Sequence, residues 1–585
     1  MAMTELTVGR STIQIVELVQ PLCANNFGFS PCTATGSNAT KCFNTRATCQ
    51  DPANYDGSSS LSLFFSSGTV AEQKVSGAPY IIPSLVSVST SPTRVNLSGV
   101  NTDASGLGNR ALVSISFKDH PHTDRRVDPY VDGRGGDPFT KGSFWSKWIV
   151  RNKFWNLIRI NVYEGYEGQA LGSMLVRTYF MNNISGPDDR GNVTIQGKDV
   201  LARIEERKAQ APSVSSGELY TNIDALATSF EVSNAVEAEY DASGVVRIGD
   251  ELIVYSSRAT STNGVTFTVS SRGYKRTVAA EHSFESEVQQ CVEYNRARVD
   301  TVLEDLLTTY GGVPSSFLDT VNWADEVDGY NGATQLTTVI SEPTAVSELI
   351  SEILQQVGAY LWWDERDQLV KYKVVRGVTE EAPLLTAENN IMPNFRVVRL
   401  PRQRVSQVWF YYTIRSYISD LEKPSNFESA TIVVAPESET EEQYGEPSIK
   451  KIFSRWFLTA AGANTTASRL ATRYVDVPRQ ATFEVDAKDR EYWTGDVIRI
   501  SHPLLVDQYG ERDIGRWTII SAEEVLSGEV IRYTCDDTTL YGKSFFIQAT
   551  GSPDYVNPAS IGFNKGFIGN ASGLLSDGTE AAKIG

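Results

Sequence analysis

Four cysteines stand close together near the start of the chain, and they are the residues with the clearest capacity for chemistry. Cys23, Cys32, Cys42 and Cys49 fall within 27 residues and are separated by eight, nine and six residues, most of them Asn, Thr, Ser, Gly or Ala. Such a segment has too few large apolar side chains to bury a core of its own. Two disulfides or a shared metal centre would order it.

These two alternatives require different redox compartments. Residues 1–20 are polar and contain no apolar stretch of the kind found in signal peptides. A chain without an export signal is made in the reducing cytosol, where stable disulfides are rare. The composition of the N-terminus therefore favours a metal centre.

Thiolate sulfur binds both Zn²⁺ and iron–sulfur clusters. Structural zinc sites commonly use close cysteine pairs about two to four residues apart, and the segment contains no such pair. Four separated cysteines can surround a larger cubane, although this spacing also departs from common ferredoxin runs. The residues alone place an iron–sulfur cluster ahead of zinc and leave both open. Cys291 and Cys535 stand apart, and we predict that they are buried thiols packing as small apolar side chains.

A polar run from residue 119 to residue 130, DHPHTDRRVDPY, holds a second group of potential metal ligands. His120 and His122 lie there beside three aspartates, a set that also occurs in hydrolase sites. Pro121 separates the two histidines, and no second histidine cluster elsewhere completes a coordination sphere. We therefore expect a polar loop, followed by an aromatic strand or short helix.

No recognisable set of catalytic residues occurs in the sequence. The GxSxG, HExxH, Walker-A and GxGxxG motifs are absent from any supporting context. The run Gly133–Gly136 is glycine-rich, but no strand and helix frame it, which argues against phosphate binding. We expect His282 to anchor a loop rather than to act in catalysis. The sequence thus predicts that the chain is not an enzyme.

The overall composition is that of a large globular chain. Its 585 residues are 41% hydrophobic and carry a formal net charge of −18. This charge would repel phosphate backbones, so direct nucleic-acid readout is not expected, although a local basic channel can escape the average. No run of about 18 apolar residues predicts a transmembrane segment.

Strand and turn patterns dominate, and they predict a mainly β (α+β) chain of several small β-barrel-like or β-sandwich-like domains with a few amphipathic helices. We expect six regions, as follows: 1–60, an N-terminal strand and the four-cysteine metal-binding segment; 61–212, a β region; 213–293, a small inserted β domain; 294–416, an α+β domain; 417–548, a C-terminal β domain; and 549–585, a Gly/Asn/Ser-rich tail.

Two helices have the clearest apolar periodicity. One spans residues 295–310 and ends at a pair of glycines. The second follows Ser341, which we expect to cap it, with Pro343 in the first turn and Gly358 at its end. A β-hairpin follows the second helix. Residues 420–448 read as a long acidic loop that is solvated or flexible.

Several stretches of the sequence resemble the tail-hub proteins of long-tailed bacteriophages and of phage-like gene transfer agents. The resemblance is distributed over roughly residues 20–545. It rests on the following segments: CFNTRATCQDP, DPYVDGRGG with GSFWSKWIVRN, IGDELIVY with SRGYKRTVAAEHS, TVISEPTAVSELISEILQQVGAYLWWDERDQLVKYKVVRG, and WTGDVIRISHPLL with GRWTIISAEEV.

This resemblance implies a structural virion protein at the tail tip, made in the host cytoplasm. It implies a homotrimeric hub (baseplate) ring that joins the distal tail protein and the tape-measure protein to the tail-fibre or receptor-binding apparatus, with roles in host attachment and DNA ejection. Some tail-tip proteins of this group carry a [4Fe–4S] cluster, whose ligands here would be Cys23, Cys32, Cys42 and Cys49; structural zinc remains the alternative. We expect such a centre to act as a folding staple rather than as an electron carrier.

Two other functions are compatible with parts of the sequence. A surface adhesin stabilised by two disulfides would account for the cysteines without a metal. A tail-associated hydrolase of cell wall or glycan would use a carboxylate pair that the sequence does not single out. Host, receptor and neighbouring proteins are not encoded in any readable pattern.

Overall fold

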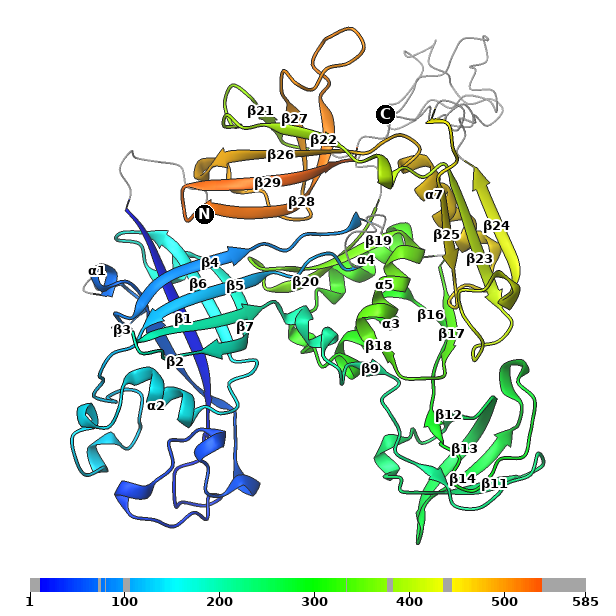
Figure 1. Ribbon diagram of the computed structural model, residues 1–585, viewed down its shortest axis with the longest axis horizontal. Helices are drawn as coiled ribbons and strands as arrows, with labels where there is room; N and C mark the ends of the chain where they lie inside the picture. The colour runs from blue at the N-terminus through cyan, green and yellow to red at the C-terminus, as the bar shows by residue number, and fades with distance from the viewer. Residues whose placement is uncertain are drawn as a thin grey trace, which may run out of the picture.

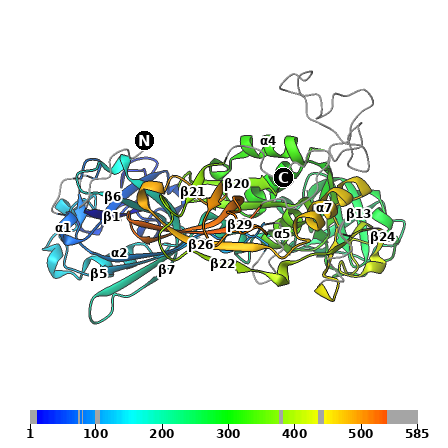
Figure 2. The same ribbon diagram turned by 90° about the horizontal axis from the view of Figure 1, so that it is seen from above.

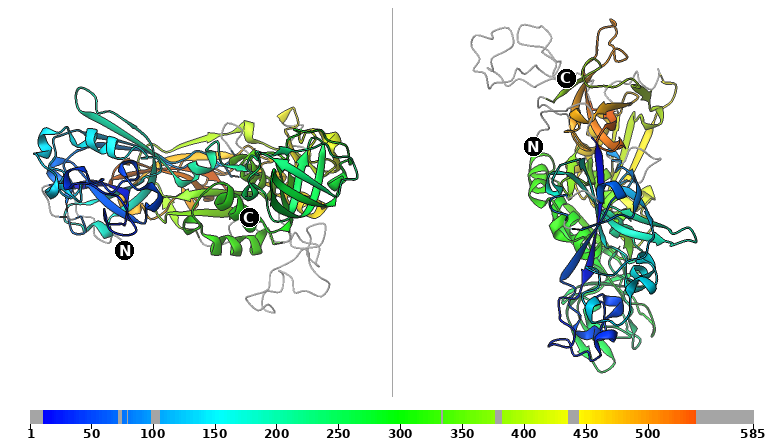
Figure 3. Two further views of the ribbon diagram at one scale, coloured as in Figure 1. Left: turned by 90° about the horizontal axis from the view of Figure 1, so that it is seen from below. Right: turned by 90° about the vertical axis from the view of Figure 1, so that its left-hand side faces the viewer.

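The structure is a computed structural model that describes residues 11–71, 75–78, 80–97, 106–332, 334–375, 382–434 and 444–538. It is mainly β, as the sequence predicts. Within these residues the large sheets have eight, six, six and three strands. Three of them surround a helical centre in Figure 1, and the views from above and from the side show a molecule much thinner than it is wide (Figures 2 and 3).

The N-terminal sheet has the strand order β3-β2-β1-β6-β7-β8-β5-β4. Its strands are β1 (Thr12–Leu22), β2 (Ser59–Phe65), β3 (Ile81–Ile82), β4 (Leu85–Ser91), β5 (Leu112–Lys118), β6 (Arg159–Tyr166), β7 (Leu175–Ser185) and β8 (Asn192–Lys198). A short helix α1 (Gly68–Ala71) follows β2.

Helix α2 (Phe144–Arg151) packs against the N-terminal sheet. Trp145 stacks on Phe65 of β2 at a centroid distance of 5.3 Å, and the indole N–H of Trp148 donates to Gln20 of β1 at 2.8 Å. Both tryptophans are fully buried. Because buried aromatic side chains contribute large apolar areas, this face fixes the helix and the loop before it on the sheet. The expected polar loop is present, and of the two alternatives predicted after it, an aromatic strand or a short helix, the structure has the helix.

A second sheet follows the N-terminal sheet in the chain and lies at the lower right of Figure 1, on the side of the helical centre away from the N-terminal sheet. Its order is β10-β11-β14-β13-β12-β15. The strands are β10 (Glu218–Leu219), β11 (Ser229–Ser233), β12 (Gly244–Ile248), β13 (Glu251–Ser261), β14 (Gly264–Ser271) and β15 (Gln289–Gln290). A tight turn precedes β13, with Gly249 at a φ of 55°, a conformation that favours glycine.

The helical centre has its own hydrophobic core, shared with strands from both sides. It contains α3 (Val299–Asp305) with a π-helical turn at Leu306–Tyr310, α4 (Thr320–Tyr330), α5 (Val346–Val357), the hairpin β19 (Ala359–Asp364) and β20 (Leu369–Val374), and the ribbons β16 (Val292–Ala297) with β17 (Leu336–Ile340) and β9 (Gln210–Ala211) with β18 (Thr344–Ala345).

The start of α5 differs from the sequence prediction. The helix begins at Val346, and the residues expected to form its first turn instead make the strand β18, which pairs with β9. Ser341 does not cap the helix; its hydroxyl donates to the carbonyl of Tyr417 at 3.1 Å. Residues 344–345 thus pair with a distant strand instead of forming a capped first turn of the helix. The predicted end of the helix at Gly358 is confirmed, because Gly358 has the left-handed conformation.

The expected loop at residues 420–448 is the second correction. Strand β24 (Phe427–Val434) occupies its middle and pairs with β23 (Gln407–Ile414), which also pairs with β25 (Ile449–Phe453). Side chains along β24 alternate between inside and outside, a period-two pattern that the acidic residues further along had obscured. Those residues, 435–443, lie outside the described residues.

Helix α7 (Ala460–Arg473) packs across this three-stranded sheet. The chain then builds a sheet ordered β21-β27-β28-β29-β26-β22. Its strands are β21 (Leu384–Thr386), β22 (Arg396–Arg399), β26 (Arg479–Asp486), β27 (Val497–Ser501), β28 (Gly515–Leu526) and β29 (Val530–Asp537). The expected tail at residues 549–585 lies outside the described residues. No described helix is both long enough and apolar enough to cross a membrane.

A buried charged cluster joins the N-terminal sheet to the C-terminal sheet. Arg177 of β7 donates to Glu164 of β6 at 2.7 Å and to Glu524 of β28 at 3.0 Å, and all three side chains are almost completely buried. Arg177 lowers the pKa of Glu164, whereas burial and the neighbouring Glu164 raise the pKa of Glu524. One cation is thus shared between two carboxyl groups, one from each sheet.

Glu365, in the turn between β19 and β20, extends this cluster into the helical centre. Its carboxyl group accepts from the Thr93 hydroxyl and from the Tyr179 hydroxyl, each at 3.3 Å. Burial raises the pKa of Glu365 to about 7, although the nearby Arg177 opposes the shift. Since its ordinary value is 4.5, the folded protein holds a proton that the unfolded chain releases between about pH 4.5 and about pH 7.

Replacing this carboxyl group therefore changes how stability depends on pH. Below the pKa of the unfolded chain, the Glu365 carboxyl group does not lower the free energy of unfolding, because both states are protonated. As the pH rises toward 7, the unfolded chain loses the proton first, so the free energy of unfolding falls progressively. In Glu365→Gln the free energy of unfolding should increase relative to wild type by about 2 to 3 kcal/mol on going from about pH 5 to about pH 8. Urea unfolding followed by tryptophan fluorescence measures this difference. The exposed Glu281→Gln serves as the control, and identical pH profiles for Glu365→Gln and wild type would refute the assignment.

Candidate functional site

The cysteine segment, residues 23–50, leaves the end of β1 and lies below α2 in Figure 1. It contains no strand or α-helix, only the 3₁₀ turns Asn38–Thr40 and Arg46–Thr48. Main-chain hydrogen bonds close it on itself: the Cys23 N–H donates to the Asn44 carbonyl at 2.7 Å, and the Cys32 N–H donates to the Phe29 carbonyl at 2.8 Å. Its order therefore comes from polar contacts, as the composition requires.

The four thiols converge in space. Cys23, Cys32, Cys42 and Cys49 line one small cavity together with polar side chains of the same segment. Each of the six cysteines of the chain is described, and none forms a disulfide. Burial raises the pKa of the Cys42 thiol; the hydrogen bond at Asn44 lowers it, and the three other thiols raise it further. The fold thus brings all four cysteines to the lining of one cavity.

The four thiols are not preformed around a single metal ion. In tetrahedral zinc sites each Zn–S bond is about 2.3 Å long, so the four sulfur atoms lie within about 4 Å of one another. Among the described side chains, no three His, Cys, Asp or Glu residues are grouped closely enough to hold one metal ion. The cavity between the thiols is also small, about 10 Å³. A cubane needs more room, so binding one would require the cysteine side chains to turn outward.

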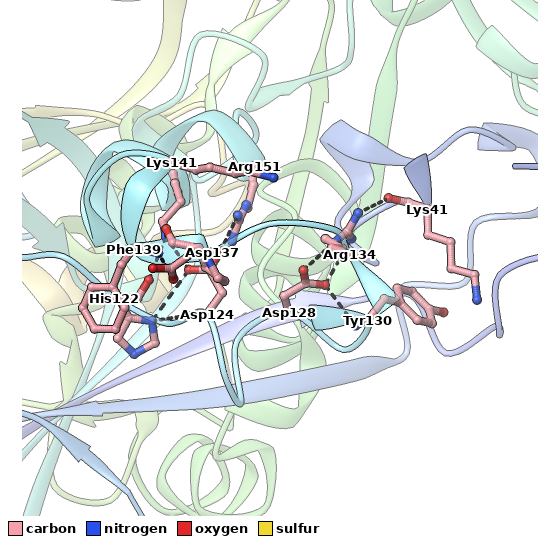
Figure 4. A network of polar contacts seen from close by, with 12 residues as sticks. Lys41, His122, Asp124, Asp128, Tyr130, Arg134, Asp137, Phe139, Lys141 and Arg151 are labelled. Carbon is pink, nitrogen blue, oxygen red and sulfur yellow. Dashed lines mark hydrogen bonds and ion pairs between the residues drawn. The ribbon is translucent and has the colours of Figure 1, made fainter. Parts of the chain in front are cut away.

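The loop before α2 holds the cysteine segment in place through Arg134 (Figure 4). Its guanidinium donates to the carbonyls of Lys41 and Cys42, each at 2.9 Å, and to the Ala39 carbonyl at 3.3 Å. The buried carboxylate of Asp128 accepts from the same guanidinium, at 3.1 Å from one of its nitrogens, and fixes its orientation. The Arg134 side chain therefore satisfies three main-chain carbonyls of a segment that forms no β-strand pairing of its own.

An aromatic contact completes this attachment. The guanidinium groups of Arg134 and Arg151 lie 3.8 Å and 4.0 Å from the centre of the Phe43 ring. The hydroxyl of buried Thr45 donates to the Arg151 carbonyl at 2.6 Å. Cation–π contacts are strongest where water is excluded, so Phe43 anchors the segment between two basic residues of the neighbouring loop and helix.

The histidines fill structural roles. His120 stacks on Phe144 at 5.5 Å, and His122 accepts the Asp124 N–H at 3.0 Å. His282 contacts Glu251 at 2.8 Å, as the predicted loop anchor. Burial alone would raise the pKa of Glu251, but hydrogen bonds from Arg272, from His282 and from two main-chain amides lower it to about 2. Cys291 and Cys535 are buried thiols, as predicted.

Arg134 is the functional residue that the sequence analysis missed. It stands in the glycine-rich run that was considered only as a phosphate loop. Its ion-pair partner is six residues away, and its main-chain partners are more than 90 residues away. No spacing rule connects residues that far apart, although the combination of a polar, cysteine-rich segment with an Asp/Arg-rich loop was visible.

No family model matches the chain, and no curated protein matches it. Among solved structures, a tail protein from Neisseria meningitidis MC58 is similar at 9% identity and a TM-score of 0.35, covering 78% of this chain and 98% of that one. The 43 kDa tail protein of prophage MuSo2 from Shewanella oneidensis is similar at 10% identity and a TM-score of 0.33, with the same coverage. A chain of the virion of a native gene transfer agent particle is similar at 12% identity and a TM-score of 0.27, covering 65% and 82%. Values this low transfer no function, so the functional argument rests on the residues.

Removing the guanidinium should release the cysteine segment. In Arg134→Met three carbonyls lose their donor, and the buried Asp128 carboxylate loses its ion-pair partner and keeps the Tyr130 N–H, which costs about 3 kcal/mol of local stability. Trypsin cleaves after Lys41 and Arg46 within the segment, and its rate under native conditions should rise about a hundredfold.

The matched control is Arg125→Met, which removes an exposed arginine from the same loop. Its cleavage rate should stay at the wild-type value. Equal cleavage of Arg134→Met and wild type would show that other contacts hold the segment.

Proposed function

We propose that this chain is a structural protein of a phage-type tail and forms the homotrimeric hub of the tail tip. The sequence segments that resemble tail hubs support this proposal, and one structural observation carries it. The aromatic and charged residues of those segments pack against other parts of the fold or pair with one another, rather than facing an open substrate site. Trp145 and Trp148 dock α2, Arg272 and His282 both bind Glu251, and Trp363 is buried in the central core.

The architecture suits such a role. Several sheets are joined rigidly around one helical centre, and buried ionic contacts connect them. A hub would join the distal tail protein and the tape-measure protein to the fibre or receptor-binding proteins, in the virion, and its ring would surround the path of the ejected DNA. A threefold ring needs a heterologous interface in which two different patches of the chain meet.

Strand β24 is the surface we assign to one side of that interface. It is the edge of its sheet, and its outward face exposes Ile432 and Val434 to 57% and 48%. Open edges with exposed apolar side chains are templates for contact with another chain. The purified protein should therefore have three times the mass of one 64.4 kDa chain by light scattering.

Ile432→Lys should shift this protein toward the monomer and reduce tail assembly in a complementation assay, because a charge would be buried in the interface. Val236→Lys, at a site exposed to 59% on the inserted sheet, is the matched control and should stay trimeric. A monomeric wild-type protein that still supports tail assembly would contradict the trimeric hub.

The cysteine segment has its own part in this proposal. Four cysteines that line one cavity and form no disulfide are the donor set of a [4Fe–4S] cluster, which would bind Cys23, Cys32, Cys42 and Cys49 once their side chains turn outward, with zinc as the alternative. When bound, the cluster would supply four strong bonds that close the segment. Because the segment has almost no apolar core, we assign the group to folding rather than to electron transfer.

Anaerobic purification with iron, sulfide and zinc analysis tests this assignment. We expect about four irons and four sulfides per chain, with a broad visible absorption near 400 nm. Cys42→Ser should lose the metal and expose the segment to protease, whereas Cys291→Ala, which removes a buried thiol elsewhere, should retain it. Zinc at about one per chain, or no metal in protein purified anaerobically, would overturn the cluster without affecting the hub.

A further inference from the structure

A second cavity lies against the outer side of the cysteine segment, and neither the hub role nor the four thiols account for it. It has a volume of about 540 Å³ and is lined by both the segment and the loop before α2. Cavities of this size hold small organic ligands. Its walls include four cationic side chains, Arg134, Lys141, Lys147 and Arg151, and two carboxylates, Asp124 and Asp128.

The charges in this cavity do not balance. Asp128 forms an ion pair with Arg134. The Asp124 carboxylate forms ion pairs with the Lys147 ammonium and the Arg151 guanidinium, each at an N–O distance of 2.7 Å. Within the described parts of the chain, Lys141 has no carboxylate partner and donates only to the Gly135 carbonyl, at 2.8 Å. The lining thus carries an excess of two positive charges in a chain whose net charge is −18. Figure 4 shows Lys41 turned away toward Tyr130, so it is not counted here.

Several donors around the cavity are still open. Among the described residues the Arg151 guanidinium donates one hydrogen bond, to Asp124 at 2.7 Å through a single nitrogen, which leaves most of its five N–H groups available. The main-chain N–H groups of Gly135 and Gly136 donate to no other residue in the described parts of the chain. Gly136 has a φ of 91°, and a Cβ there would lie 3.1 Å from the Lys141 ammonium. The glycine therefore keeps the wall open beside the uncompensated lysine.

We propose that this cavity binds a phosphate group, carried on a small polyol or sugar or present as the free ion. Guanidinium, ammonium and main-chain N–H donors on one wall are the groups that bind phosphate oxygens. The cavity is larger than a phosphate ion alone requires, which leaves room for an organic substituent. The site is built from cationic side chains, so it does not depend on the strand–helix frame whose absence argued against a P-loop.

Isothermal titration of the full-length protein with inorganic phosphate and with sn-glycerol 3-phosphate tests this proposal. Both should bind, and tighter binding of glycerol phosphate identifies a phosphorylated polyol, whereas equal or weaker binding identifies the free ion. Lys141→Glu should weaken binding about tenfold or more, because it removes one charged donor and reverses its charge. Lys141 is exposed and makes one hydrogen bond, so this variant keeps the fold.

Lys153→Glu is the matched control, because it makes the same charge reversal at an exposed lysine that does not line the cavity. Its affinity should stay within about twofold of wild type. Gly136→Ala provides a second variant, which should weaken binding without any change of charge. No binding at millimolar phosphate, binding of citrate but not of either phosphate, or equal affinities for Lys141→Glu and Lys153→Glu would overturn the proposal.

Discussion

The guanidinium of Arg134 satisfies three main-chain carbonyls of a segment that has no β-ladder and only a small hydrophobic cluster, and the geometry of the cysteines depends on that contact. The carboxylate of Asp128 holds the guanidinium from behind, and Phe43 packs against its face. A polar segment pays the full entropic cost of ordering and must recover it through hydrogen bonds with a neighbour. The loop before α2 is that neighbour, and it is itself fixed to the N-terminal sheet by buried tryptophans.

A buried arginine also connects the N-terminal sheet with the C-terminal sheet. Arg177 is buried with Glu164 and Glu524, and such a cluster gives little net stability because desolvation offsets the attraction. What it provides is a defined relative position, since only one arrangement of the two sheets brings both carboxyl groups onto the guanidinium.

The sequence predicted those features that depend on periodicity or on short-range chemistry. The strand β1, the hairpin after Gly358 and the helix at Phe144 follow from apolar spacing, and the structure confirms the mainly β class. The predictions were wrong where pairing with residues far away in the sequence determines the local structure. Residues 344–345 joined β9 instead of starting a helix, and β24 formed because β23 lay beside it. The four cysteines line one cavity, whereas Arg134 and the basic cavity involve contacts across more than 90 residues that no local pattern encodes.

The central claim is that residues 23–50 form an ordered segment held by hydrogen bonds to itself and to the adjacent loop. Amide hydrogen exchange with mass spectrometry on the wild-type protein tests it directly. The N–H groups of Cys23 and Phe43, which donate to the Asn44 carbonyl and to the Thr48 hydroxyl, should exchange much more slowly than in an unfolded peptide of the same sequence. Exchange throughout the segment at the rate of that peptide would contradict the account.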